Sequence, residues 1–145
     1  MKLLMAVMAS AVMAELQVTQ YDGPTTCDEA DTVKAGKQLG MHYTGTIDKS
    51  SKTGEPGKQF DSSRGRGVFE TKIGVGQVIK GWDEGLVGLC KGAKATLVIP
   101  PDMGYGESGA GGAIPGGATL NFDVEVCAWP QRTHLTAPGP PSLSC

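Results

Sequence analysis

The clearest pattern in the chain is a strict alternation of apolar and polar residues close to its C-terminal end. Over Leu120–Val126 the sequence reads Leu, Asn, Phe, Asp, Val, Glu, Val, the two-residue period of a strand with one buried and one solvated face. Four other runs rich in apolar and β-branched residues are bounded by clusters of Gly, Pro, Ser and Asp. They predict further strands at residues 16–20, 38–47, 69–73 and 93–99.

One short segment has helical spacing instead. Val78, Trp82 and Leu86 recur at every fourth residue, which places them on one face of a helix over residues 80–86. Several strands with a single short helix predict an antiparallel α+β domain. The stretch at 48–59, rich in Lys, Ser, Gly and Pro, is predicted to be a solvated loop.

The N-terminus has the parts of a secretory signal peptide. Lys2 precedes an apolar run at 3–14, and polar sequence begins at Glu15. This run is too short to span a bilayer, which takes about 20 apolar residues; a buried N-terminal helix is the alternative interpretation. The sequence therefore predicts a signal peptide at 1–14, one domain at 15–128 and a flexible tail at 129–145.

Composition and charge narrow the classes of partner. A chain of 145 residues that is 39% hydrophobic can bury one core but is too short for two full domains. The formal net charge is −2, and no block of like charge stands out that could bind a phosphate backbone. We therefore expect neither a nucleic-acid partner nor a membrane span.

The cysteines favour disulfides over metal or redox chemistry. Cys27, Cys90, Cys127 and Cys145 include no C-x-x-C pair, so neither a zinc site nor a catalytic dithiol is expected. In an oxidising compartment such cysteines form disulfides. Four cysteines allow three pairings, and their spacing does not choose among them.

Two motifs in the second half of the chain lack the surrounding sequence that their usual functions require. Residues 104–109 satisfy G-x-G-x-x-G, but the Gly- and Ala-rich stretch that follows cannot form the helix that a dinucleotide site requires. Ser108 is not in a nucleophile elbow, because position 110 is Ala rather than Gly. His42 falls inside a predicted strand, where a structural role is expected. No cofactor is therefore predicted.

Aromatic residues gather at the edges of the predicted strands and turns. Six of the eight in the chain stand there, and they could line one pocket or simply fill the core of a small β domain. The six are Tyr43, Phe60, Phe69, Trp82, Tyr105 and Phe122.

Several short segments decide between these interpretations. They are HYTG at 42–45, FDSS at 60–63, GQVIKGW at 76–82, IPP at 99–101, GYG at 104–106, IP at 114–115, and ATL at 118–120 before Phe122. Together, and in this order, they resemble the FKBP-type peptidyl-prolyl cis-trans isomerases. The resemblance covers about residues 16–128 and is strongest to the endoplasmic-reticulum, FKBP2-like branch, since Cys27 and Cys90 stand where that branch carries its disulfide.

The resemblance implies a fold and a set of site residues. The fold is a five-stranded antiparallel half-barrel wrapped around one short helix, with a disulfide between Cys27 and Cys90 and with Arg66 as a partner for the charge of Asp61. Catalytic roles fall to Asp61, Tyr105, Trp82 and Phe122. Substrate-binding roles fall to Tyr43, Phe60, Phe69, Gln77, Val78, Ile79 and Ile114.

The implied function is acceleration of X-Pro rotation during the folding of secretory proteins, in the lumen of the endoplasmic reticulum, by a monomer. Proline-containing polypeptides and macrolides of the tacrolimus and rapamycin type are the implied partners. A proline-binding chaperone or interaction module with little isomerase activity is the main alternative, and a purely structural secreted domain is another. The stretch 106–113 carries small residues where relatives often carry bulky ones, so we expect it to be mobile.

Overall fold

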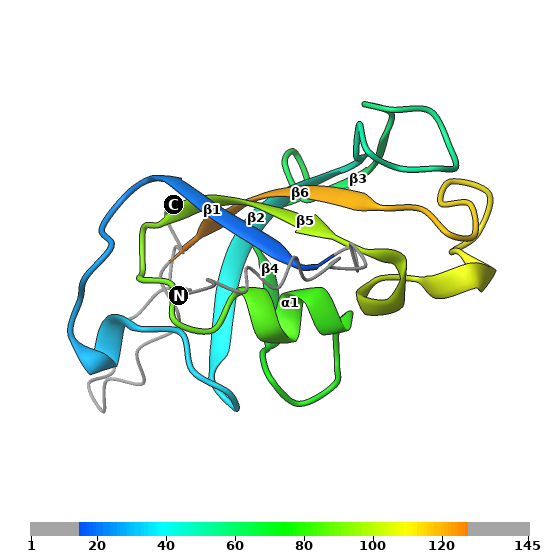
Figure 1. Ribbon diagram of the computed structural model, residues 1–145. Coiled ribbons are helices and arrows are strands. Elements are labelled where there is room, and N and C mark those ends of the chain that lie inside the picture. The colour runs from blue at the N-terminus through cyan, green and yellow to red at the C-terminus, as the bar shows by residue number, and fades with distance from the viewer. Residues whose placement is uncertain (1–14, 128–145) are drawn as a thin grey trace, which may run out of the picture.

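A computed structural model describes residues 15–127, in which six antiparallel strands form one open, twisted sheet over a short helix (Figure 1). The predicted signal peptide and C-terminal tail lie outside the described residues. The strands follow the order β1-β5-β6-β2-β3, and β4 also pairs with β2. Their bounds are β1 Gln17–Asp22, β2 Gln38–Ile47, β3 Gln59–Ser62, β4 Phe69–Lys72, β5 Lys94–Ile99 and β6 Leu120–Val126.

The α+β class is confirmed, but the sheet has six strands where the resemblance implied five. The additional strand is β3, whose four residues QFDS include a single apolar one, so no apolar run marks it in the sequence. Both β3 and β4 pair with β2. Residues 44–46 of β2 pair with β3, and residues 38–41 of β2 pair with β4. They therefore act as one interrupted strand along the same edge of β2.

The last strand in sequence lies in the middle of the sheet. β6 pairs with β5 on one side and with β2 on the other. Its alternation holds as predicted, because its four apolar side chains are 0–2% exposed and form part of the core, while its polar side chains face outward. These four are Leu120, Phe122, Val124 and Val126.

The helix α1, Lys80–Gly85, lies unusually close to the sheet. A Cβ atom added at Gly81 would be 2.6 Å from Cγ2 of Ile99, and one at Gly85 would be 2.9 Å from Cδ2 of Leu97. Both strand residues are fully buried. The two glycines stand four apart, on one face of the helix, so the helix backbone itself rests on β5.

Within residues 15–127, three single-turn 3-10 helices occupy the connections, at Glu29–Asp31, Pro101–Met103 and Gly106–Ser108. A disulfide joins Cys27, just before the first of them, to Cys90, just before β5. The bond closes a loop with a sequence separation of 63, and on the chain-entropy model a loop of that length contributes about 4 kcal/mol. No helix among residues 15–127 is long and apolar enough to cross a membrane.

The connection between β2 and β3 is exposed over most of its length, as predicted, yet it is anchored at its base. The Gly57 N–H donates to the Ile47 carbonyl at 2.8 Å, and the Ile47 N–H donates to the Lys58 carbonyl at 2.9 Å. Asp48 is 5% exposed and accepts hydrogen bonds from Ser50 and from the Asn121 amide. This loop is therefore a defined part of the fold.

We expect Gly81→Ala to lower the free energy of unfolding by about 1 kcal/mol, the difference between the two opposing effects. Alanine gains about 1 kcal/mol of helix propensity, but overpacking against the buried, β-branched Ile99 costs roughly 1–3 kcal/mol. Urea denaturation measures the difference. The matched control is Gly112→Ala, where the added Cβ has no atom within 4 Å and stability should be unchanged. A Gly81→Ala protein at least as stable as the parent would contradict the close packing of α1.

Asp48 gives a second prediction, which concerns pH. Burial alone would raise its pKa, but hydrogen bonds from the Ser50 hydroxyl, the Ser50 N–H and the Asn121 amide together lower it below its ordinary value. A carboxyl whose pKa falls on folding stabilises the protein above its unfolded-state pKa, about 3.9, and loses that contribution as pH falls through the folded value. Asp48→Asn should therefore destabilise the protein at pH 6, and the difference should shrink below pH ~4. A difference that stays constant from pH 6 to pH 2.5 would show that the ionised form is not favoured.

Candidate active site

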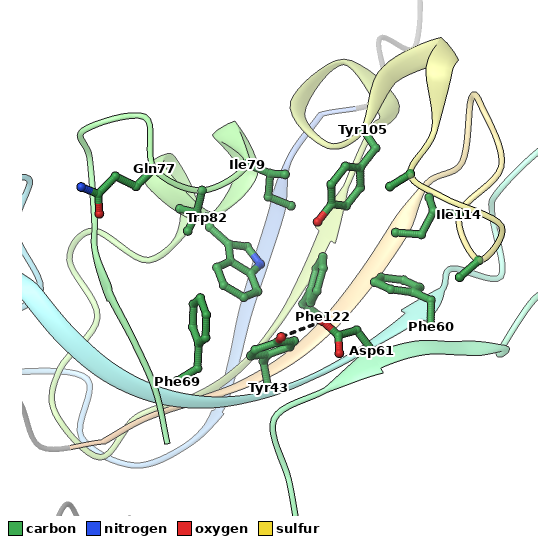
Figure 2. A pocket seen from close by; sticks show the side chains of 13 residues that line it. Tyr43, Phe60, Asp61, Phe69, Gln77, Ile79, Trp82, Tyr105, Ile114 and Phe122 are labelled. Carbon is green, nitrogen blue, oxygen red and sulfur yellow. Dashed lines mark hydrogen bonds between the residues drawn. The ribbon is translucent and has the colours of Figure 1, made fainter. Parts of the chain in front are cut away.

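A pocket of about 680 Å³ opens between α1, the inner face of the sheet and the loops at 77–79 and 105–114 (Figure 2). All eleven side chains to which the resemblance gave catalytic or binding roles lie in its lining. The lining also contains two residues that sequence reasoning missed, because a methyl side chain in a Gly-rich loop carries no signal. The full set is Tyr43, Phe60, Asp61, Phe69, Gln77, Val78, Ile79, Trp82, Tyr105, Ala110, Ala113, Ile114 and Phe122.

Trp82, the third residue of α1, is at the centre of the aromatic lining and only 5% exposed. Its ring centroid lies 5.0 Å from that of Tyr43, 5.1 Å from that of Phe122 and 5.9 Å from that of Phe69. The three contacts are edge-to-face, at 69° to 78°. Such pairs add about 0.5–1.5 kcal/mol each beyond the area that they bury, so the rings fix one another in place.

The Trp82 indole N–H is the one buried side-chain polar group within the described range that has no hydrogen-bond partner. Figure 2 shows the indole nitrogen on the side of the ring toward Phe122. An N–H next to an aromatic face gains a weak interaction with it, which offsets part of the cost of burying an unpaired donor. The centre of the pocket therefore contains no side-chain group that competes strongly for a ligand's amide.

Gly45 on β2 allows two of the rings to meet. A Cβ atom there would be 2.6 Å from Cε2 of Phe60 and 2.8 Å from Cε1 of Phe122. Without it, these rings lie over the strand backbone and contact each other edge-to-face at 5.5 Å. The glycine of the HYTG segment is thus a packing requirement of the pocket wall.

The one charged residue in the pocket lining, Asp61, lies at the rim. Asp61 accepts hydrogen bonds from the Tyr43 hydroxyl at 2.7 Å, the Arg66 guanidinium at 2.5 Å and the Ser62 N–H at 2.8 Å. The partnership of Asp61 with Arg66 was predicted from the resemblance and is confirmed. Burial and the hydrogen bond to Asp61 raise the pKa of Tyr43 to about 12. Tyr43 is therefore a neutral donor that holds the carboxylate in one orientation.

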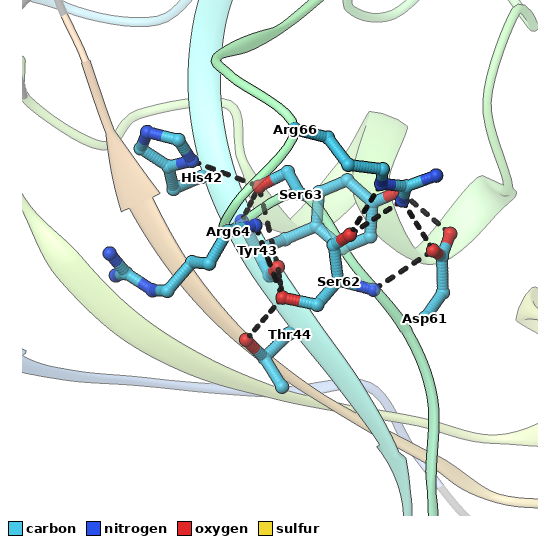
Figure 3. A network of polar contacts seen from close by, with 8 residues as sticks. All are labelled: His42, Tyr43, Thr44, Asp61, Ser62, Ser63, Arg64 and Arg66. Carbon is cyan, nitrogen blue, oxygen red and sulfur yellow. Dashed lines mark hydrogen bonds and ion pairs between the residues drawn. The ribbon is translucent and has the colours of Figure 1, made fainter.

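Behind the rim, a polar network joins β3 to β2 (Figure 3). Ser63, which is 3% exposed, accepts a hydrogen bond from the Tyr43 N–H at 2.8 Å, and its hydroxyl lies 3.1 Å from His42 Nδ1. The Ser62 carbonyl accepts two bonds from Arg66. His42 takes part in this network and not in the pocket lining, which fits the structural role expected of it.

Besides the buried Trp82 indole N–H, two donors at the sides of the pocket are without a partner among residues 15–127. The Tyr105 hydroxyl makes no hydrogen bond there, and burial, followed by the nearby charge of Asp61, raises its pKa, so it stays protonated. The backbone N–H of Ile79, immediately before α1, also donates to no described group. Both can donate to a carbonyl of a bound chain.

The loop that carries Ile79 is held by a carboxylate on α1. Asp83 accepts the N–H groups of Gly74 and Gly76 at 2.8 and 3.0 Å. These two bonds fold the loop back over the first turn of the helix. Gln77, Val78 and Ile79 then line one side of the pocket.

The opposite wall comes from the small-residue loop after Tyr105. Ala110 and Ile114 exchange two backbone hydrogen bonds, at 2.9 and 3.1 Å, and the Gly117 N–H donates to Gly106 at 2.9 Å. Mobility of this loop stays a prediction. In the structure it is a closed, hydrogen-bonded turn that leaves Ile114 only 6% exposed.

Comparison with known proteins agrees with this geometry. A family model described as "FKBP-type peptidyl-prolyl cis-trans isomerase" matches residues 29–127. The chain therefore belongs to the FKBP-type peptidyl-prolyl cis-trans isomerase family. Within that family it is similar to proteins named FKBP2 or FK506-binding protein 2, the branch that the cysteines had indicated.

Three relatives show the extent of the similarity. FK506-binding protein 2B of Rhizopus delemar is 56% identical over 93 residues, 63% of this chain and 42% of that protein. FK506-binding protein 2 of Dictyostelium discoideum is 55% identical over 94 residues, 64% of this chain and 65% of that protein. Human peptidyl-prolyl cis-trans isomerase FKBP2 is 50% identical over 103 residues, 70% of this chain and 68% of that protein.

A solved structure gives the same fold. The crystal structure of AtFKBP13 superimposes with a TM-score of 0.61 at 33% identity, covering 77% of this chain and 90% of that one. For the first two sequence relatives, the matched segment is less than two thirds of their own length. The similarity therefore concerns the domain that contains the pocket.

The rim carboxylate yields a prediction about activity on X-Pro peptides. Asp61→Val removes the acceptor that orients the Tyr43 hydroxyl and Arg66 at the rim, and we expect kcat/KM to fall about tenfold, the equivalent of about 1.4 kcal/mol of transition-state stabilisation. Stability should change less, because Asp61 lies at the half-exposed rim. The matched control is Asp102→Val, an exposed carboxylate outside the pocket. Equal kinetic constants for Asp61→Val and the parent, both shown to be folded, would remove Asp61 from the mechanism.

Proposed function

We propose that this domain is a peptidyl-prolyl cis-trans isomerase that accelerates rotation about X-Pro bonds in proteins of the secretory pathway. One observation carries the proposal. An apolar pocket centred on Trp82 has its only charge at the rim and two unpartnered donors, the Tyr105 hydroxyl and the Ile79 N–H, at its sides. In this proposal the proline ring of the substrate packs against the Trp82 indole, and the Tyr105 hydroxyl and the Ile79 N–H donate to carbonyls of the substrate backbone.

The chemistry follows from amide resonance. Rotation about the C–N bond has a barrier of about 18–20 kcal/mol because the planar amide is stabilised by charge separation. The twisted transition state is less charge-separated, so an apolar, water-poor wall disfavours it less than it disfavours the planar amide. No bond forms or breaks, and the rate rises through tighter binding of the twisted conformer than of either planar one.

The pocket lining also supports a preference for the residue before proline. Phe60, Phe122 and Ile114 present an apolar surface next to the place of the ring. We infer that large apolar side chains at that position gain the most from burial, at about 25 cal/mol per Å². Asp61 stays at the edge, where its bonds to Tyr43 and Arg66 keep the carboxylate from entering the apolar surface.

The compartment and the partners are proposed on separate grounds. The Cys27–Cys90 disulfide is typical of an oxidising environment, and with a signal peptide at 1–14 it supports residence in the lumen of the endoplasmic reticulum. We further propose a monomer whose functional domain is 15–128, followed by a flexible tail at 129–145. Because its relatives are named FK506-binding proteins, tacrolimus- and rapamycin-type macrolides are proposed ligands beside proline-containing polypeptides.

The proposal is tested by isomerisation kinetics on peptides of the form X-Pro, with X as Phe, Leu, Ala or Glu. We expect catalysis of all four, with kcat/KM highest for Phe and Leu and inhibition by tacrolimus. The measurement is magnetisation exchange between cis and trans signals, which needs no coupling protease. If the protein binds the peptides and tacrolimus without raising the exchange rate, it is a proline-binding chaperone or interaction module and not an isomerase.

A further inference from the structure

The loop between β2 and β3, residues 48–58, reaches the back of the pocket wall. Both this loop and the Gly-rich loop that precedes β6 lie at the same end of the sheet (Figure 1). The Thr53 hydroxyl donates to the Gly116 carbonyl at 2.9 Å, and the Ser51 hydroxyl accepts the Thr119 N–H at 3.0 Å. These bonds join segments 63 and 68 residues apart in sequence.

Ser51 connects the two segments through one side chain. Its hydroxyl donates to the Thr53 carbonyl at 2.7 Å while it accepts from Thr119. The Asp48 N–H donates to the Thr119 carbonyl at 2.9 Å, and the Asp48 side chain accepts from Asn121. The start of β6 is therefore held by two residues of one loop, Asp48 and Ser51, while Thr53 bonds to Gly116 just before it.

The same loop packs against the proline that follows the wall residue Ile114. A Cβ atom at Gly54 would lie 3.1 Å from Cγ of Pro115 and 3.4 Å from Cγ2 of Ile47. Gly54 also has a φ of +79°, a conformation that side-chain-bearing residues rarely adopt. The glycine thus lets the loop backbone approach Pro115 from the side opposite to the pocket.

Ile114 is the pocket residue on which these contacts converge. It is 6% exposed, lines the pocket, and stands one residue before Pro115 and two before Gly116. On its N-terminal side it is fixed by the paired backbone bonds with Ala110. On its C-terminal side no regular strand begins until Leu120, so the support there comes from the bonds of Ser51 and Thr53 together with the bond from the Gly117 N–H to the Gly106 carbonyl.

We propose that Ser51 and Thr53 are positioning residues for the pocket wall: from outside the pocket they hold Ile114 against the bound substrate. The inference rests on the proposed isomerase function of the same pocket. Neither side chain lines the pocket, so both act through the backbone of 115–119. Because the wall contacts the substrate in the planar and twisted states alike, its displacement weakens binding uniformly and raises KM while kcat changes little.

The test uses a pair of variants at one position. Thr53→Val keeps the shape of the side chain and removes the hydroxyl, whereas Thr53→Ser keeps the hydroxyl and removes a methyl group. We expect Thr53→Val to raise KM for a Phe-Pro peptide about fivefold, the equivalent of one neutral hydrogen bond, with kcat within twofold. Thr53→Ser should restore the parent KM. Ser51→Ala should act as Thr53→Val does, and the exposed Lys52→Ala in the same loop should leave both constants unchanged.

A second readout does not depend on catalysis. The ¹³C-labelled δ1 methyl group of Ile114 is followed by NMR in the parent, Thr53→Val and Thr53→Ser proteins. The proposal requires a shifted or broadened signal in Thr53→Val and a parent-like signal in Thr53→Ser. An unchanged methyl signal in Thr53→Val, or a loss of thermal stability with KM unchanged at 10 °C, overturns the positioning role.

The two readouts separate failure of this inference from failure of the proposed function. If the parent protein does not catalyse X-Pro exchange, the isomerase proposal is refuted. The positioning role is then tested by two other measurements, the Ile114 methyl signal and the affinity for tacrolimus. In that case Thr53→Val must weaken tacrolimus binding about fivefold and Thr53→Ser must not. Equal affinities in both variants overturn the inference.

Discussion

The contact between α1 and β5 decides where the pocket lies. Because Gly81 and Gly85 have no side chains, the helix backbone rests directly on Ile99 and Leu97 of the sheet. At that separation Trp82, between the two glycines in sequence, is held within edge-to-face distance of Tyr43 and Phe122, which come from β2 and β6. A helix displaced outward by one side-chain layer would leave the indole out of reach of the strands.

The site divides into a rigid apolar interior and a polar rim, and each is built by different means. The interior uses rings that pack against one another and a glycine that removes the obstacle between them. The rim uses a carboxylate satisfied by a tyrosine, an arginine and a backbone N–H. Since Asp61 has three donors of its own within the protein, it contributes its charge without requiring one from the ligand. Among the groups left for the ligand are the Tyr105 hydroxyl and the Ile79 N–H.

How far the sequence predicts this architecture depends on how local each feature is. The alternation in Leu120–Val126 is a property of seven consecutive residues, and β6 appears where it was expected. The pocket residues come from seven separate strands, loops and helices, so no periodicity could have assembled them, and only the family resemblance did. β3 has one apolar residue among its four, too few to show a period. The bonds of Ser51 and Thr53 span more than 60 residues, and nothing in a Ser- and Lys-rich loop indicates what it contacts.

The place of β6 in the sheet has a consequence for biosynthesis. A chain made from its N-terminus produces β1 to β5 first, yet β2 and β5 do not pair with each other and are joined only through β6. Until that final strand has left the ribosome, both neighbours present unpaired edges and an uncovered apolar face. Folding of the described domain is therefore a late event, completed only once β6 has been synthesised, and the growing polypeptide needs protection from aggregation until then.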